Sequence, residues 1–307
     1  MGSCPSLPRP QNGRSRPTTP PCTVQPLLQG NVSAHALAQT SSIEEPPDTI
    51  HTPNGATVDL AALVQPGQWL TDEHINAFCD ILQERARGRV LFLNTFFMPT
   101  LMGAACGGYD YSRVRRWTRP PLLLKRAGVE RIFDAGKHGS VSGLQLVLAP
   151  VHVARLHWWL AAVDLGARRV HCLDSARADA ANWDPSRGKD AITALVRWLE
   201  DERLDKGGPI REKQTARREW QMDMEPDMAV QRDPSHSGDC GMFTCAAADW
   251  LVAAVMSSTN VQCDLSLPPF TGGASTHLHS MDMPAARLSM AAILQATYSV
   301  HSNATGC

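Results

Sequence analysis

The first 68 residues of this 307-residue chain contain no Phe, Trp or Tyr, and Trp69 is the first aromatic residue. Ten of the 22 prolines lie before position 54, in a segment that is otherwise rich in Ser, Thr, Gln and Gly. Such a segment cannot bury enough apolar surface to offset the entropy that is lost on folding. We therefore predict a disordered tail over residues 1–60 and one folded domain over residues 61–303.

Other absences exclude whole classes of protein. The formal net charge is only −1, whereas nucleic-acid-binding proteins carry basic patches or stripes, so we expect no nucleic-acid partner. We find no apolar run of transmembrane length and no signal peptide. The nine cysteines are odd in number and lack the paired spacings of zinc sites, which indicates free thiols, a reducing compartment and no bound metal.

The N-terminal residues fit one short modification pattern. Gly2 follows the initiating Met and precedes Ser6 at the spacing of a myristoylation signal, and Cys4 offers a thiol for a second acyl chain. One acyl chain binds a membrane only marginally, whereas two can anchor a protein. Acylation at Gly2 and Cys4 is therefore a hypothesis for the tail.

A thiol stands where a polar loop changes into a long apolar run. Cys240 ends the segment that begins at Gln231, and the run from Met242 to Met256 contains no Gly or Pro and is long enough for a buried helix. A cysteine at a helix N-terminus feels the positive end of the backbone dipole, which favours the nucleophilic thiolate. Cys240 is therefore a candidate catalytic nucleophile; the alternative is a small apolar residue that fills a gap beside a helix.

A candidate general base lies in an apolar hairpin. Residues 156–175 form two apolar runs around the turn at residues 164–167. If the turn is centred between Leu165 and Gly166, His157 lies directly opposite Asp174, with Cβ atoms roughly 4.5–5.5 Å apart. A carboxylate at this distance can orient the imidazole through one ring nitrogen and leave the other nitrogen to take a proton from a thiol.

The same hairpin offers a rival pair, His171 and Asp164. Asp164 falls in the expected turn, where Asp is favoured for local reasons, so we prefer His157 and Asp174. A slip of one residue in the register would put those two side chains on opposite faces of the hairpin.

These residues and several blocks around them resemble the Ulp1/sentrin-specific protease family of cysteine peptidases. The likeness extends over residues 69–297. The blocks that carry it are residues 69–76 (Trp-Leu-Thr-Asp-Glu-His-Ile-Asn), 92–97 (Phe-Leu-Asn-Thr-Phe-Phe), 114–118 (Val-Arg-Arg-Trp-Thr), the His-Trp pair at 157–158, 199–202 (Leu-Glu-Asp-Glu), 238–243 (Gly-Asp-Cys-Gly-Met-Phe) and 281–284 (Met-Asp-Met-Pro) with Arg287.

The resemblance implies an α+β, papain-like cysteine protease fold, in which a central mixed sheet packs against the helix that carries the nucleophile. It implies Cys240 as the nucleophile, His157 as general base and acid, and Asp174 as the residue that orients His157. It also implies that Trp69 and Trp158 line a narrow tunnel for a Gly-Gly tail.

The chain departs from the family pattern in two places. The family has an oxyanion-stabilising Gln a few residues before the Cys; here the nearest upstream is Gln231, which is farther away, with Pro234 near the expected position. We interpret residues 233–236 as a small insertion and assign the oxyanion role to Gln231; without it, backbone N–H groups would act alone. The second departure is the longer segment 120–142, where we expect a surface loop or short helix that changes substrate contacts.

The resemblance implies cleavage after the Gly-Gly C-terminus of a ubiquitin-like modifier, with SUMO as the expected modifier, in precursor processing, deconjugation or both. No cofactor is expected. The alternatives are NEDD8 or ubiquitin as the modifier, the related acetyltransferases that also use His, an acid and Cys, and a catalytically impaired module that binds modifiers without cutting them. The family default favours the nucleus over the cytoplasm.

The apolar periodicity predicts the main elements of the domain. Helices are expected at residues 72–87, 189–204, from 240 onward and at 284–296, and strands at residues 90–97, 144–152, 156–163, 169–173 and 218–222.

Overall fold

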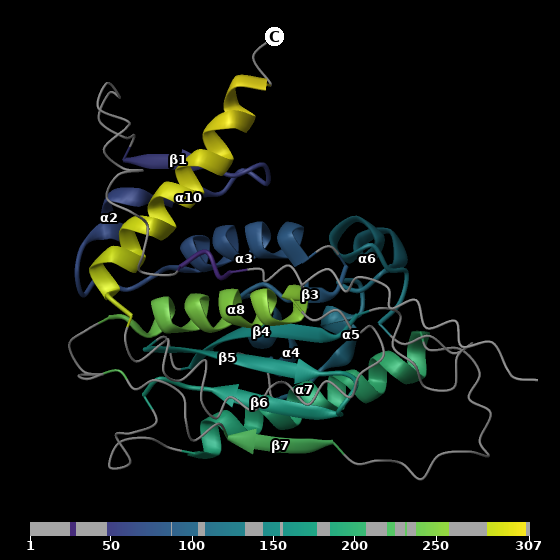
Figure 1. Cartoon of the computed structure of the whole chain (residues 1–307). Coiled ribbons are helices and arrows are strands. Elements are labelled where there is room, and N and C mark those ends of the chain that lie inside the picture. Colours follow the sequence, from purple (N-terminus) through teal and green to yellow (C-terminus); the bar gives the residue numbers. More distant parts are fainter. Residues whose placement is uncertain are drawn as a thin grey trace, which may run out of the picture.

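The computed structural model describes residues 25–28, 48–86, 88–103, 108–132, 144–153, 156–176, 185–206, 220–224, 231, 238–257 and 281–304. Its centre is a five-stranded mixed sheet in the order β3-β4-β5-β6-β7 (Figure 1). The strands are β3 (Val90–Phe92), β4 (Leu146–Val153), β5 (His157–Asp164), β6 (Arg169–Leu173) and β7 (Gln221–Met224). The β4-β5-β6 core is antiparallel, and the two outer strands β3 and β7 pair in parallel with their neighbours.

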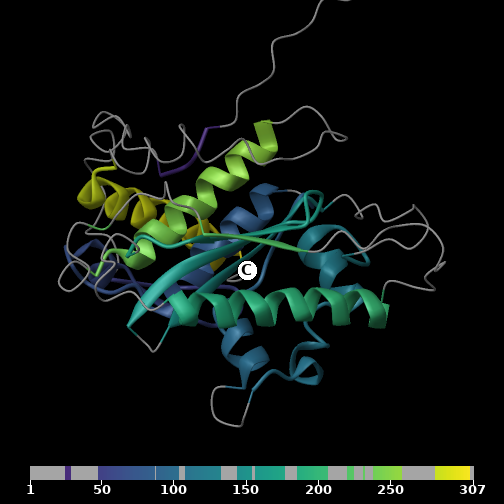
Figure 2. The ribbon, with the colours of Figure 1, turned by 90° about the horizontal axis from the view of Figure 1, so that it is seen from below.

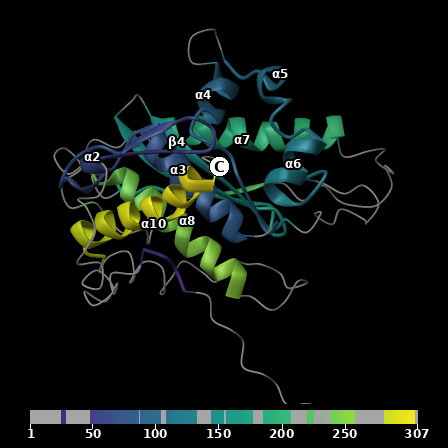
Figure 3. The same ribbon diagram turned by 90° about the horizontal axis from the view of Figure 1, so that it is seen from above.

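Helices cover both faces of this sheet (Figures 2 and 3). One face carries α3 (Asp72–Ala86) and α8 (Cys240–Ser257), with α10 (Met283–Ala304) packed against these two helices. The other face carries α4 (Phe97–Met102), α5 (Tyr111–Val114) and α7 (Pro185–Lys206), and α6 (Pro120–Ala127) lies beside β3. Successive side chains of β5 alternate between the two resulting cores, so that Trp158 packs on the α8 side and Trp159 on the α7 side. The expected α+β fold, with a mixed sheet packed against the Cys240 helix, is confirmed.

The apolar character of α8 follows from its position. It packs against α3 and β5, and nearly all of its side chains are buried. Within the described residues, α8 is the one helix that is long and apolar enough to cross a membrane, although no such run was identified from the sequence. However, 78% of this helix is buried inside the protein. Packing in the core accounts for its composition, and the predicted helix from Cys240 onward is confirmed.

Ordered structure begins earlier than residue 61. An antiparallel hairpin of β1 (Thr49–His51) and β2 (Thr57–Asp59) leads into α2 (Leu60–Val64), and both β1 and α2 contact α10. Ile50 and Val58 are buried in the main core, so the predicted boundary at residue 60 is too late. Residues 25–28 also pack on the domain, and the rest of the tail lies outside the described residues.

A buried histidine joins this hairpin to the start of α3. His74 Nδ1 accepts from the Thr71 N–H at 3.0 Å, and His74 Nε2 donates to the carbonyl oxygen of Asp59 at 2.7 Å. Because one ring nitrogen accepts and the other donates, these contacts require the neutral imidazole. Burial lowers the pKa of His74, which favours the same neutral form.

Several predicted boundaries differ from the structure. The strand expected at residues 90–97 ends at Phe92, because the side chain of Asn76 in α3 accepts from the Thr95 N–H at 2.9 Å and draws the chain away from β4 before α4 begins. The last helix continues to Ala304 rather than 296. The segment 120–142, by contrast, was expected to be a surface loop or a short helix, and the structure shows the short helix α6 at its start; residues 133–142 lie outside the described part.

Candidate active site

Three chain segments meet at one end of the sheet. His157 is the first residue of β5, Asp174 directly follows β6, and Cys240 is the first residue of α8. His157 Nε2 donates to Asp174 Oδ1 at 2.6 Å, and the His157 ring is also hydrogen-bonded to the Cys240 thiol. The structure thus brings together the three side chains that were selected from the sequence, with the imidazole between the acid and the thiol.

The contact between His157 and Asp174 is confirmed, but the predicted hairpin register is wrong by two residues. The observed ladder pairs Leu160 with Leu173 and Asp164 with Arg169, so the turn is centred one residue later than predicted. A shift of two residues keeps every side chain on its face of the sheet, and diagonal neighbours remain within reach of long side chains. Asp174, just beyond the ladder, therefore still reaches His157.

The rival pair is not assembled. His171 pairs with Ala162, and Asp164 pairs with Arg169, so His171 and Asp164 do not face each other. Asp164 Oδ1 accepts from the Ala167 N–H at 2.8 Å, which closes the turn. This is the local role for which Asp is favoured in turns.

The surroundings of His157 favour its charged form. Burial lowers the pKa of His157, but the hydrogen bonds and charges of Asp174 and Cys240 outweigh that effect and raise the pKa to about 9. Asp174 is itself buried, and its Oδ1 also accepts from the Ala176 N–H at 2.9 Å, which fixes the carboxylate. At neutral pH the site therefore holds an imidazolium next to a thiol at the positive end of α8, an arrangement that suits an ion pair with a thiolate.

Gln231 lies beside the acid of the site. Its backbone N–H donates to the carbonyl oxygen of Ser175 at 2.9 Å, and its side chain is buried. Because Ser175 follows Asp174 in sequence, this hydrogen bond places Gln231 close to Asp174. Residues 232–237, which include the predicted insertion, lie outside the described residues, and the oxyanion role of Gln231 stays a prediction.

The two tryptophans expected to line a tunnel have different environments. Trp158 is buried; its Nε1 donates to the Leu70 carbonyl oxygen at 3.0 Å, and its ring stacks on His152 with centroids 3.8 Å apart. Trp69, one residue before Leu70, is 43% exposed. Trp158 thus holds the loop of residues 67–70, here called the Trp69 loop, and Trp69 presents an apolar surface to solvent.

Two glycines let the Trp69 loop pack against the start of α8. Gly238 has φ +56°, and a Cβ there would lie 2.2 Å from the carbonyl oxygen of Gly67. A Cβ on Gly241 would lie 2.7 Å from the Cβ of Leu70. Both distances are shorter than real side chains allow, so these positions require glycine, and Trp69 is carried on a loop that touches both sides of Cys240.

The buried side chain of Arg287 holds the Trp69 loop and the start of α8 together. It was not identified as functional from the sequence, where it was noted only as part of a motif. Arg287 of α10 donates through Nη1 to the carbonyl oxygen of Leu63 at 2.9 Å and through Nη2 to that of Gln68 at 2.7 Å. Its Nη2 also lies 2.7 Å from Asp239 Oδ1, and its side chain is only 1% exposed. One guanidinium therefore joins α10, α2, the Trp69 loop and the residue before Cys240. The signal in the sequence is a single cation in the apolar run that follows Pro284.

Among the described residues, no group of three or more His, Cys, Asp or Glu side chains is placed so that it could hold a metal ion. The buried thiols Cys79 and Cys245 have pKa values raised mainly by burial, so they are poor nucleophiles and poor ligands.

Comparison with known proteins places the chain in a family. The model of the Ulp1 protease family, C-terminal catalytic domain, matches residues 68–298. Ubiquitin-like-specific protease 1A of Arabidopsis thaliana is 32% identical over 193 residues, which cover 61% of this chain and 32% of that protein. Sentrin-specific protease 2 of Rattus norvegicus is 32% identical over 188 residues, 60% of this chain and 26% of that protein. The chain thus spans about a third or less of the length of these relatives.

Solved structures show the same fold at lower sequence identity. The C-terminal Ulp1 protease domain in complex with SMT3, the yeast ortholog of SUMO, superimposes with a TM-score of 0.51 at 18% identity and covers 85% of this chain and 94% of that chain. The catalytic domain of the Ulp1-like SUMO protease of Chaetomium thermophilum gives a TM-score of 0.53 at 21% identity and covers 89% and 91%. The family model matches about three quarters of this chain, and the solved structures share its fold. The chain therefore belongs to the Ulp1 protease family.

Proposed function

We propose that this protein is a cysteine peptidase that cleaves after the Gly-Gly C-terminus of a ubiquitin-like modifier, with SUMO as the preferred modifier. The observation that carries the proposal is the position of His157, which bridges Asp174 at 2.6 Å and the thiol of Cys240. Nucleophile, base and orienting acid in this order are the parts that thiol-dependent acyl transfer requires.

The reaction follows from the charges at the site. His157 holds the proton of Cys240, and the thiolate attacks the carbonyl carbon of the last glycine to form a tetrahedral intermediate. Backbone N–H groups at the start of α8 and the side-chain amide of Gln231 are the proposed donors to its oxyanion. The imidazolium then gives its proton to the departing amine, which leaves a thioester on Cys240.

A second half-reaction restores the enzyme. The neutral imidazole takes a proton from water, the resulting hydroxide attacks the thioester carbon, and the thiolate leaves while the modifier is released as a free carboxylate. Asp174 stabilises the imidazolium in both halves, because its Oδ1 accepts from Nε2 and leaves Nδ1 to face the thiol.

The Trp69 loop supplies the proposed specificity. Glycine has no side chain, so a narrow apolar passage beside Cys240 admits a Gly-Gly tail and rejects bulkier residues. Trp158 fixes the loop through Leu70, and Trp69 offers its exposed ring to the tail. The names of the relatives, ubiquitin-like-specific and sentrin-specific proteases, and the SMT3 complex of the similar structure support a SUMO-type modifier.

Covalent capture tests this function. Purified protein is mixed with SUMO, NEDD8 and ubiquitin, each with a thiol-reactive group at its C-terminus, and adducts are counted on a denaturing gel. We expect an adduct with SUMO, none for Cys240→Ala, and an unchanged adduct for Cys245→Ala, whose buried thiol lies on the same helix. An adduct with NEDD8 or ubiquitin alone would reassign the modifier, and a folded protein that forms none would leave a binding module as the function.

A further inference from the structure

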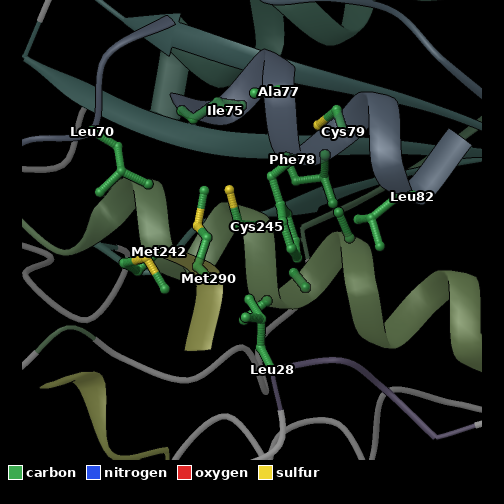
Figure 4. Close-up of a cluster of buried hydrophobic side chains, with 14 of the residues drawn as sticks. Leu28, Leu70, Ile75, Ala77, Phe78, Cys79, Leu82, Met242, Cys245 and Met290 are labelled. Carbon is green, nitrogen blue, oxygen red and sulfur yellow. The ribbon is translucent and has the colours of Figure 1, made fainter. Parts of the chain in front are cut away.

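A short segment far from the active site in sequence lies against the catalytic helix. Leu28 is 1% exposed and belongs to the main core, and Leu27 packs against the same core. Figure 4 shows Leu28 beside α8, in one cluster with Phe78 of α3, Cys245 of α8 and Met290 of α10. A leucine from the Pro-rich tail thus completes the core between three helices.

The backbone of this segment is gripped by a pair of charged side chains. The Leu28 N–H donates to Asp249 Oδ2 at 2.7 Å, while Asp249 Oδ1 lies 3.0 Å from Nη1 of Arg85. Arg85 Nη2 in turn donates to the carbonyl oxygen of Gln25. One side chain therefore binds a donor of the segment and the other an acceptor, and the two bind each other.

Asp249 is a buried charge that binds both the segment and Arg85. It is the only charged residue of α8, it is fully buried, and each of its oxygens has a different partner. Burial raises the pKa of Asp249 to about 6, against the opposing effects of the Leu28 N–H and Arg85, so the carboxylate is still ionised at neutral pH. A buried carboxylate needs a donor at each oxygen, and here Arg85 and Leu28 supply them.

We propose that α3, α8 and α10 form a docking site for a short extended apolar peptide, which in this chain is occupied by its own residues 25–28. The site binds the main chain through Arg85 and Asp249 and takes one leucine side chain into the core, so it recognises an extended backbone with a buried anchor. The proposal does not depend on the peptidase activity, because Asp249 lies nine residues along α8 from Cys240, about 14 Å at 1.5 Å per residue.

The geometry favours the segment of the same molecule over that of a second copy. Residues 29–47 join the segment to β1, and 19 residues can span roughly 60 Å when extended. β1 contacts α10, and Met290 of α10 lies in the cluster that holds Leu28, so both ends of the connection are on the same helix layer. A connection of 19 residues is therefore long enough for the segment to come from the same molecule.

Hydrogen exchange on the full chain tests the docking. The Leu28 amide is expected to exchange at least about tenfold more slowly than the same amide in a free peptide of residues 21–32. Leu28→Asp places a second carboxylate beside Asp249 and should abolish this protection and lower the melting temperature. Leu288→Asp, at an exposed leucine of α10, is the matched control and should change neither.

The vacated site gives a second, independent readout. Labelled peptide 21–32 should bind the Leu28→Asp protein, and the same peptide with Leu28→Asp should not. An unprotected Leu28 amide in the wild-type protein, or a Leu28→Asp protein as stable as the wild type, would overturn the docking. Protection that increases with protein concentration would overturn the assignment to the same molecule. Covalent capture of the modifier by the Leu28→Asp protein is measured as well, so that a failure of the docking is distinguished from a failure of the proposed function.

Discussion

Replacing Arg287 by Ala should destabilise the protein and uncouple the Trp69 loop from the segment that carries Cys240. The substitution leaves Asp239 without its cation and the carbonyl oxygens of Leu63 and Gln68 without their donors. Removing one partner of a buried ion pair costs about 3–5 kcal/mol. A domain whose folding free energy is about 5–15 kcal/mol would lose a large part of its stability.

Arg287→Lys separates the loss of charge from the loss of geometry. A lysine keeps the positive charge but has a single ammonium group, which cannot reach Leu63, Gln68 and Asp239 together. We expect a smaller loss, about 1.5–3 kcal/mol for one hydrogen bond that involves a charged group. Because the Trp69 loop is then less well held, kcat/KM for a SUMO substrate should fall more than the folded fraction does.

Urea denaturation at pH 7 measures the stability of both variants, and steady-state cleavage of a C-terminal fluorogenic SUMO conjugate measures kcat and KM. Leu288→Ala, at the exposed neighbouring position, is the control and should stay within about 0.5 kcal/mol of the wild type. If Arg287→Lys unfolds at the same urea concentration as the wild type and cleaves at the same rate, the fastening role of Arg287 is refuted.

Three further predictions concern pH and glycine. Because the pKa of His157 is about 9, kcat/KM should decline above about pH 9 as the imidazolium loses its proton, and Asp174→Asn should move this decline about 1–3 pH units lower; an unmoved decline would show that Asp174 does not set it. Gly238 has a positive φ and lies against the Trp69 loop, so Gly238→Ala should lower the free energy of unfolding, measured by urea denaturation, by more than about 3 kcal/mol. Gly55 has a positive φ but lies in open space, so Gly55→Ala should lower it by about 1 kcal/mol. Equal losses would contradict the close approach of Gly238 to the loop. His74 has a folded-state pKa below 6.5, so its contribution to stability should be lost as pH falls from 6.5 through that pKa, and urea midpoints at pH 7 and pH 5 should differ less in His74→Gln than in the wild type.

The hairpin illustrates what local patterns predict and where they stop. The apolar runs located β5 and β6 to within one residue, and alternation placed His157 and Asp174 on one face. The register was missed because Gly166 suggested the centre of the turn, whereas the residue at positive φ is Arg168, at 55°. A non-glycine residue in the left-handed region is uncommon, so nothing local identified it.

The features that the sequence did not predict are tertiary. The composition of the first 60 residues is that of a disordered chain, yet Leu28, Ile50 and Val58 are buried. Their partners are surfaces that exist only after α3, α8 and α10 have packed together, and an average over composition cannot reveal single anchoring residues. Arg287 was overlooked as functional for the same reason, because its partners Leu63, Gln68 and Asp239 come from segments that are far from it in the chain.

The position of Arg287 in the last helix has a consequence for protein synthesis. Residues 67–70 and 238–240 meet at Cys240, and both leave the ribosome before α10 does. Nothing joins them through a guanidinium until residue 287 has emerged. Chains grow at about 5–20 residues per second, so a nascent chain exists for seconds with its thiol, imidazole and acid already made but not fastened. A site built in this way is fastened only after α10 has been made, so the Trp69 loop and Cys240 are held together only once residue 287 has left the ribosome.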